Sequence, residues 1–380
     1  AKEFVATVEM NQLQSSTLKR WSETKVIFNQ AKAEEYLNKG PESENPLDIL
    51  KWANDHPFLK VSKMKIPIGI VPEEFEETYL YDIVVAPPKS RGPRVIDDDI
   101  YDAFPFIRSF VPRGLCILTT TNSNTKVSES KIVIFAMKKF TGGPGDDDDQ
   151  EEVDSTDTVE QEKTPRYEHY FLEPSANTVH LISTSKENGD ASHLGQVRLG
   201  SETYLIFGSK NVHLLAKKAS DVDKYTEQRF TVARIIAKHM FECIEGLDKA
   251  GFAKFLDYME LNSLTATMEF LQLENQHIEY FDFAKSTFRF ITFTSNKHLN
   301  SLVYDDILAS VEVARAAGFE TVTVEKYAFS EQDVAYDKIR QGYGKEGAVV
   351  YYVNGQGHII GLVKKKTIWY VVVRSIREKA

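Results

Sequence analysis

The residues best suited to carry out chemistry are lysines and glutamates that lie on or beside predicted strands. Lys186 precedes an Asn-Gly pair, Glu269 lies within an apolar strand pattern, and Glu346 begins another strand. Asn-Gly favours a tight type I′ turn, so residues 183–218 predict a β-hairpin that holds Lys186 at a fixed point beside its turn. A lysine in such a place is usually a solvated surface residue, so its significance depends on the groups that accompany it.

Two further lysines share one face of a strand near the end of the sequence. Strand alternation places Lys364 and Lys366 on the same side. The Asn354-Gly355 turn brings this strand alongside the previous strand, which begins at Glu346. Two carboxylates, three lysines and the neighbouring Lys210 therefore predict a cluster that binds a nucleoside triphosphate and a divalent metal ion.

Composition favours a folded, intracellular protein. The chain has 380 residues, of which 42% are hydrophobic, enough for two cores or one large core. Two cysteines cannot form a disulfide framework or a Cys-rich zinc site, and no apolar run reaches transmembrane length. The net charge of −10 is concentrated in residues 146–162, which carry ten acidic and no basic residues. The formally neutral remainder can still present a basic groove to nucleic acid.

The predicted elements define an α+β chain of antiparallel sheets with helices packed over them. We expect helices at 225–245, 252–259 and 305–317, and strands at 79–85, 113–118, 131–136, 264–271, 277–283, 288–294, 321–326, 348–353 and 358–365, the last continuing through 369–374. Residues 142–164 are rich in like charge and poor in apolar side chains, which predicts a disordered acidic insert. An N-terminal module of unclear role is expected at 1–110 and a second domain at 111–380.

Read together, these motifs resemble the covalent nucleotidyltransferases, a family of RNA ligases, DNA ligases and mRNA capping enzymes. Within that family they are most similar to phage-type RNA ligases and the ligase domain of fungal tRNA ligases. The matching motifs, in family order, are Arg113-Gly114-Leu115, Lys139-Phe140, Lys186-Glu187-Asn188-Gly189, Ser209-Lys210-Asn211, Met268-Glu269-Phe270, Phe288-Arg289-Phe290, Glu346–Tyr351 and Lys364-Lys365-Lys366. At the second motif the sequence departs from the family pattern, because Thr141 and Gly142 replace Phe and Asn.

The resemblance implies a nucleotidyltransferase (ATP-grasp-like ligase) domain with an N-terminal α/β module, and an ATP-dependent RNA ligase. Such an enzyme joins RNA 5′-phosphate and 3′-hydroxyl ends through a lysyl-AMP intermediate and an adenylylated RNA end. The implied nucleophile is Lys186. The implied nucleotide-binding residues are Glu187, Asn188, Gly189, Lys210, Glu269, Phe290 (stacked on adenine), Glu346, Lys364, Lys366, Arg113 and Lys139, with Glu346 and Glu269 as Mg²⁺ ligands.

The same resemblance implies RNA as the partner, with a role in RNA repair or tRNA splicing and with end-healing enzymes acting in trans. Attack by a lysine requires an unprotonated amine, whereas a free lysine has a pKa near ~10.4. We therefore expect Lys364, Lys366 and a bound Mg²⁺ to lower the pKa of the nucleophile.

Two alternatives remain open at this point. One is a guanylyltransferase of the mRNA-capping type, which we disfavour because the segment after Lys366 is too short for the OB-fold of such enzymes. The other is a catalytically silent RNA-binding module that keeps the fold. Covalent labelling by ATP, by GTP or by neither nucleotide distinguishes the three.

Overall fold

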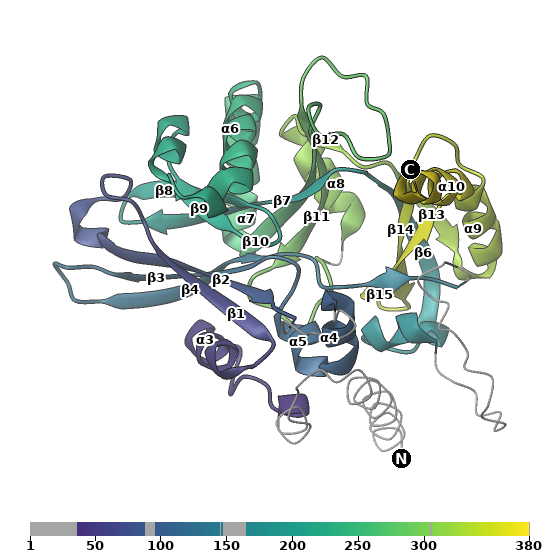
Figure 1. Cartoon of the computed structure of the whole chain (residues 1–380), viewed down its shortest axis with the longest axis horizontal. Helices are drawn as coiled ribbons and strands as arrows, with labels where there is room; N and C mark the ends of the chain where they lie inside the picture. Colours follow the sequence, from purple (N-terminus) through teal and green to yellow (C-terminus); the bar gives the residue numbers. More distant parts are fainter. Residues whose placement is uncertain (1–35, 88–95, 145, 147–164, 305, 380) are drawn as a thin grey trace. The chain divides into compact units, whose positions relative to one another are not determined.

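The computed structural model describes residues 36–87, 96–144, 146, 165–304 and 306–379. The chain divides into two compact units, Ala1–Val133 and Ile134–Ala380. Our sequence prediction placed the boundary after residue 110 instead. The difference arises because strands beyond residue 110 complete the sheet that the N-terminal unit begins. Both units combine helices with sheets (Figure 1).

The N-terminal unit contains a four-stranded sheet in the order β1-β2-β3-β4. β1 pairs with β2, and β2 with β3, in antiparallel register. Its strands are β1 (Leu59–Lys65), β2 (Glu77–Val85), β3 (Leu115–Thr121) and β4 (Ser128–Phe135), and its helices are α3 (Pro46–Asp55), α4 (Asp97–Ala103) and α5 (Pro105–Phe110). The strands predicted at 79–85, 113–118 and 131–136 are confirmed as β2, β3 and β4.

A histidine lies in the core of the N-terminal unit. His56 is 3% exposed, and the rings of Trp52 and Phe104 contact it edge-on. Its Nδ1 atom accepts a hydrogen bond from the Phe58 amide, whereas its Nε2 atom has no partner within the described residues. Burial in this apolar site lowers the pKa of His56 to about 4, so the ring is neutral at pH 7.

We expect this histidine to make the protein less stable in mild acid. The unfolded chain binds a proton on His56 near pH ~6.5, whereas the folded chain resists it down to about pH 4. The stabilisation is therefore complete above pH ~6.5, and about 2 kcal/mol of it is lost by pH 5. Urea unfolding at pH 7 and pH 5 should show a smaller pH dependence for His56→Asn, which keeps an acceptor for Phe58. Equal pH dependence in both proteins would contradict this account.

The second unit contains two sheets, six-stranded in the order β12-β11-β10-β7-β8-β9 and five-stranded in the order β13-β6-β14-β15-β5. Its strands are β5 (Thr141–Gly142), β6 (Thr178–Lys186), β7 (Asp190–Leu199), β8 (Glu202–Gly208), β9 (His213–Ala216), β10 (Leu264–Leu271), β11 (Thr287–Ser295), β12 (Glu320–Thr321), β13 (Val324–Ala328), β14 (Gly347–Asn354) and β15 (Ile359–Lys366). Most pairs are antiparallel, and the short strands β12 and β5 pair in parallel. This confirms the predicted α+β class.

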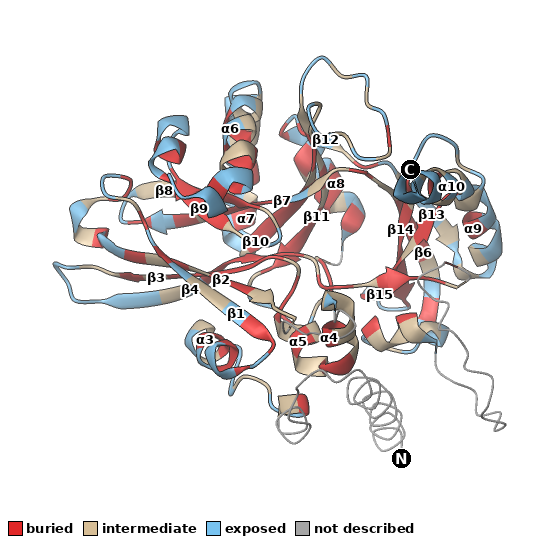
Figure 2. Cartoon of the chain, in the orientation of Figure 1, coloured by how far each residue is buried: buried red, intermediate tan, exposed pale blue. Residues whose placement is uncertain are grey.

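Helices cover the two sheets of this unit. α6 (Thr231–Glu245), α7 (Lys249–Asn262) and α8 (Ile307–Ala316) pack on the six-stranded sheet, and α9 (Gln332–Arg340) packs on β13, β14 and β15 (Figure 1). Figure 2 shows that the strands of the two sheets are largely buried. Of the apolar stripe predicted for α6, Ala233, Ile236 and Met240 are fully buried and Ile244 is half-buried, and the helix begins at Thr231 rather than at residue 225. The helices predicted at 252–259 and 305–317 correspond to α7 and α8.

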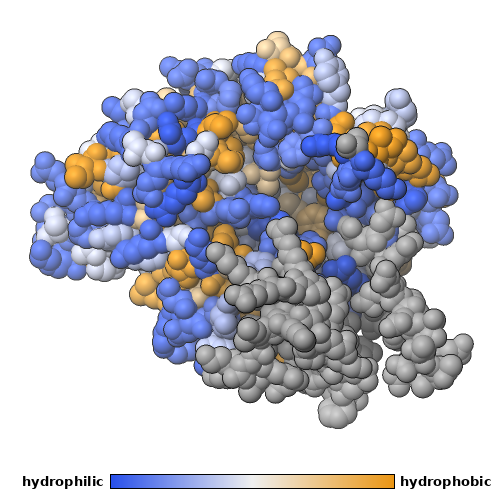
Figure 3. All heavy atoms as spheres, in the orientation of Figure 1, coloured by the Kyte–Doolittle hydropathy of each residue, from blue (hydrophilic) through white to orange (hydrophobic). Residues whose placement is uncertain are grey.

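Three of the strands predicted for this unit are wrong. Residues 277–283 form a loop rather than a strand, and 321–326 is divided between β12 and β13, which belong to different sheets. Residues 369–374 lie in helix α10 (Ile368–Lys379), not in a strand. The Thr367 hydroxyl accepts the Tyr370 amide and so caps this helix despite its β-branched residues. Exposed apolar side chains remain along α10, visible as a hydrophobic stripe at the upper right of Figure 3.

The start of the predicted acidic insert is ordered. Gly142 belongs to β5, and Asp146 is 1% exposed, with its Oδ2 atom accepting the Lys366 amide at 3.0 Å. Disorder is therefore the wrong prediction for these first residues, because a buried amide of β15 gives the first aspartate a partner. Residue 145 and residues 147–164 lie outside the described part of the chain.

Candidate active site

Three predicted site positions form a row across the five-stranded sheet. Gly347 on β14 pairs with Lys186 on β6 and with Lys366 on β15. Residues directly opposite each other in antiparallel strands point to the same face, so both lysines project on one side of the sheet with the glycine between them. Lys364, two residues earlier on β15, shares that face. The structure thus brings together the three lysines that the sequence placed in one cluster.

The Glu346 carboxylate contacts both Lys186, the candidate nucleophile, and Asn188 of the same motif. Its Oε1 atom lies 2.6 Å from the Lys186 Nζ atom, and its Oε2 atom accepts a hydrogen bond of 2.7 Å from the Asn188 side-chain amide. The Glu346 side chain is only 8% exposed. Since a buried carboxylate is stable only when paired, this arrangement fixes the position of the lysine ammonium.

The protonation of Lys186 differs from our expectation of a lowered pKa. Protein atoms surround most of the side chain, and this desolvation lowers its pKa, but the carboxylates of Glu346 and Glu269 outweigh burial and raise the pKa above the usual value. The groups nearest to the ammonium are anionic rather than cationic. In the described structure, therefore, the amine is held protonated rather than activated for attack.

The Asn188-Gly189 pair does not form the predicted hairpin. β6 pairs with β13 and β14, whereas β7 pairs with β8 and β10, so the connection crosses from one sheet to the other. A type I′ turn needs positive φ at both central residues, and neither residue has it. Instead the Asn188 Oδ1 atom accepts the amides of Ile278 at 2.7 Å and Glu279 at 3.0 Å.

Changing Asn188 to aspartate tests this role of the side chain. The carboxylate of Asn188→Asp still accepts both loop amides but cannot donate to Glu346 and repels it. We expect the free energy of unfolding to fall by about 1–3 kcal/mol, as for a buried group that loses its partner. Asn45→Asp is the matched control, because Asn45 caps α3 as an acceptor and aspartate caps a helix equally well. Equal stability of the two variants in urea unfolding would contradict the assignment.

Glu269 lies close to the lysine cluster, as predicted. It stands on β10, and its Oε1 atom accepts the Gly189 amide at 3.0 Å. A Cβ atom on Gly189 would lie 2.3 Å from the Phe270 carbonyl oxygen, so only glycine allows this approach. Part of the Glu269 side chain reaches solvent, but the surrounding protein desolvates the carboxyl and raises its pKa to about 7, against the opposing effect of Lys186.

Two predicted nucleotide contacts lie elsewhere. The Glu187 carboxylate accepts hydrogen bonds from the Ser185 hydroxyl at 2.6 Å and from Arg289 at 2.9 Å, outside the lysine cluster. Phe290 is completely buried, and its ring packs against Phe255 of α7. It therefore points to the opposite face of the sheet from Glu269, and stacking of Phe290 on adenine is the wrong prediction.

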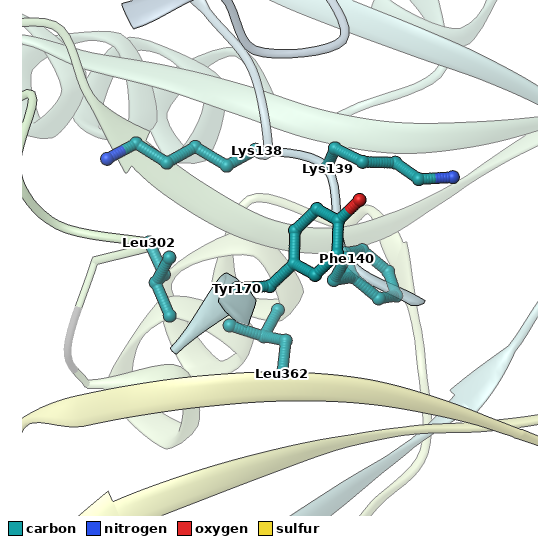
Figure 4. Close-up of a pocket in the computed structure, with 6 residues that line it drawn as sticks. All are labelled: Lys138, Lys139, Phe140, Tyr170, Leu302 and Leu362. Carbon is teal, nitrogen blue, oxygen red and sulfur yellow. The ribbon is translucent and has the colours of Figure 1, made fainter. Parts of the chain in front are cut away.

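Lys139 lies beside β15. Lys138, Lys139 and Phe140 line a narrow pocket with Tyr170, Leu302 and Leu362 (Figure 4). Figure 4 shows the two lysine side chains extending in opposite directions. Leu362 and Lys364 lie on the same face of β15. Thr141 and Gly142, which replace the Phe and Asn of the family motif, form β5, and β5 pairs in parallel with β15. The motif thus approaches the sheet that carries Lys186.

The nucleotide contacts predicted for Lys210 and Arg113, like those predicted for the residues of the lysine cluster, stay predictions. Lys210 is exposed after β8, and none of the cluster contacts described above involves it. Arg113 belongs to the N-terminal unit, where it lies 3.9 Å from Asp98, and its placement relative to the lysine cluster is not described.

Sequence reasoning missed three residues around the cluster. Glu279 accepts the Glu346 amide and is buried, which raises its pKa to about 7. The Tyr370 hydroxyl lies 3.4 Å from the Asn188 amide nitrogen, and Asp146 binds the Lys366 amide. Tyr370 follows the Lys-X-Lys motif closely and could have been found by this position. Nothing in the local sequence marks the other two.

The chain belongs to the family described as "Domain of unknown function (DUF7920)", whose model matches residues 96–377. None of the curated proteins compared with the chain matches it. Among the helices of the described residues, none is sufficiently long and apolar to span a membrane.

Solved structures similar to the chain include Naegleria gruberi RNA ligase with PPi, at 11% identity and a TM-score of 0.37, covering 53% of this chain and 54% of that one. A variant of the same ligase with ATP and Mn has 11% identity and a TM-score of 0.35, with 56% of each chain covered. The chain therefore spans about half the length of these structures. A likeness this distant assigns neither an activity nor a residue role.

Proposed function

We propose that this protein is an ATP-dependent RNA ligase that joins 5′-phosphate and 3′-hydroxyl ends through covalent AMP on Lys186. The observation that carries the proposal is the Lys186–Gly347–Lys366 row, with Glu346 bonded to both Lys186 and Asn188. Motifs separated by about 180 positions in the sequence meet on one face of a sheet, as covalent nucleotidyl transfer requires.

In the first step, the Lys186 Nζ atom forms a bond to the α-phosphorus of ATP, and the bond from that phosphorus to the bridging oxygen breaks to release pyrophosphate. Lys364 and Lys366, on the same face, offset the negative charge that builds on the phosphates. The ammonium must first lose a proton to solvent water and separate from Glu346. This requirement follows from the raised pKa of Lys186 in the described structure.

In the second step, an oxygen of the RNA 5′-phosphate attacks the same phosphorus, and the bond to Lys186 breaks. The 3′-hydroxyl of the other RNA end then attacks the 5′-phosphorus and releases AMP. RNA with other ends would first need end-healing enzymes in trans.

The residues of the cluster fit a bound Mg²⁺. Glu346 and Glu269 both act on the Lys186 ammonium, so two carboxylates converge on one place, and Mg²⁺ takes one or two carboxylates together with waters and phosphate oxygens. These two residues would hold the ion, which supplies positive charge beside the phosphates when bound.

The proposal is tested with α-labelled ATP or GTP and Mg²⁺, after pyrophosphate treatment to remove any bound AMP. We expect label from ATP but not from GTP to stay on the protein after denaturation. The labelled native protein should seal RNA with a 5′-phosphate and a 3′-hydroxyl. Preferential labelling by GTP would indicate a guanylyltransferase instead. Salt-sensitive RNA binding without any label would indicate a silent binding module.

A further inference from the structure

A second cavity lies on the opposite face of the sheet from Lys186. It has a volume of about 190 Å³ and is formed by β6, β13, β14, α9 and the segments that flank them. Ser183 and Ser185 of β6 line it, whereas Lys186 points away from it by strand alternation. The volume is below that of a site for a drug-sized molecule, which is usually ~300 Å³ or more, but exceeds the space that one water needs.

The charged groups that line this cavity carry a net positive charge. Lys338 and Lys345 contribute two ammonium groups and Glu325 one carboxylate, and all three are exposed at its edge. Lys338 donates to both oxygens of Glu325 at 2.8 Å. Lys345 has no ion-pair partner among the residues that the structure describes. One positive charge is therefore left uncompensated.

The inner wall supplies hydrogen-bonding groups. Ser183 is 7% exposed, and its hydroxyl has no hydrogen-bond partner in the described part of the chain. The Ser185 hydroxyl, by contrast, already donates to Glu187 and accepts the Thr323 amide. A hydroxyl that opens into the cavity can donate a hydrogen bond to a ligand oxygen there.

We propose that this cavity is a binding site for phosphate, either free or at the end of a phosphomonoester. A tetrahedral oxyanion accepts hydrogen bonds on all its oxygens, so it can bind Ser183, Lys338 and Lys345 together. The site is separate from the nucleotide-binding cluster and does not depend on the proposed ligase activity.

The site shares its strands with the candidate active site. Ser185 precedes Lys186, and Lys345 precedes Glu346, so these two lining residues adjoin members of the lysine cluster. The Thr367 hydroxyl, also in the lining, donates to the Lys345 carbonyl at 2.7 Å. Phosphate bound here would therefore contact the same backbone that positions the lysine.

Calorimetric titration of the full chain with inorganic phosphate and, separately, with cytidine 5′-monophosphate tests the proposal. We expect saturable binding of one ligand per chain. Lys345→Met and Lys338→Met should each weaken it on the order of tenfold, and Ser183→Ala several-fold, as charge-assisted and neutral hydrogen bonds are lost. Lys326→Met removes the same charge from a lysine of β13 that does not line the cavity, and should bind phosphate normally.

The two ligands identify the source of the phosphate. Equal affinity for both indicates the free ion, and tighter binding of the nucleotide indicates a phosphomonoester end. Lys186→Met should leave phosphate binding unchanged. Absence of saturable binding of either ligand would overturn the proposal, and so would loss of phosphate binding in Lys186→Met but not in Lys345→Met.

Discussion

Replacing Lys186 with arginine should reduce covalent labelling by ATP at least ~10³-fold, because the variant keeps the positive charge but lacks a usable nucleophile. The guanidinium can still pair with Glu346, so the buried carboxylate is not left alone. Sealing of RNA by the protein should be lost with the label. Labelling is measured with α-labelled ATP after denaturing electrophoresis.

Lys326→Arg is the matched control for this substitution. Lys326 lies on β13 of the same sheet and is exposed, and none of the cluster contacts involves it. It should label like the wild type. Labelling of Lys186→Arg at a rate close to that of the wild type would show that another residue carries AMP.

Gly347→Ala should damage both the fold and the labelling reaction. Gly347 has φ of +151°, and an added Cβ would lie 2.0 Å from the Lys365 carbonyl oxygen. Such an approach cannot be accommodated without shifting β14 from β15. We expect a loss of about 2–3 kcal/mol in the free energy of unfolding. We also expect a reduction in labelling on the order of 10²-fold, because Lys186 and Lys366 flank this position.

Gly355→Ala provides the comparison on the same hairpin. An added Cβ there meets nothing closer than a Val179 methyl group at 3.7 Å, an ordinary contact. Its unfolding free energy should change by less than about 0.5 kcal/mol. If chemical unfolding shows equal stability for the two variants, the packing of β14 against β15 at Gly347 is not the constraint that the structure indicates.

Two Asn-Gly pairs show where sequence reasoning succeeds and where it fails. At Asn354-Gly355 the asparagine accepts the amides of Gln356 and His358, within its own turn, and the predicted hairpin of β14 and β15 is confirmed. At Asn188-Gly189 the same side chain accepts amides some 90 positions away. A local rule predicts the first pair because its partners are local. The partners of the second exist only once the chain has folded.

The face of a strand residue was predictable where its neighbours alternate, as for Lys364 and Lys366. It was not predictable for Phe290, because both faces of β11 carry large groups and the choice depends on α7 packing over one of them. The Lys186 pKa shows the same limit. The prediction of a lowered pKa combined Lys364, Lys366 and a bound Mg²⁺, whereas among the protein's own groups the contact with Glu346 raises the pKa.

The most direct measurement of the central claim is peptide mapping by mass spectrometry after incubation with ATP and Mg²⁺. The account predicts one AMP adduct per chain, located on Lys186 and removed by added pyrophosphate. An adduct on another residue, or none on folded protein that has been freed of bound AMP, would contradict the assignment of Lys186 as the nucleophile.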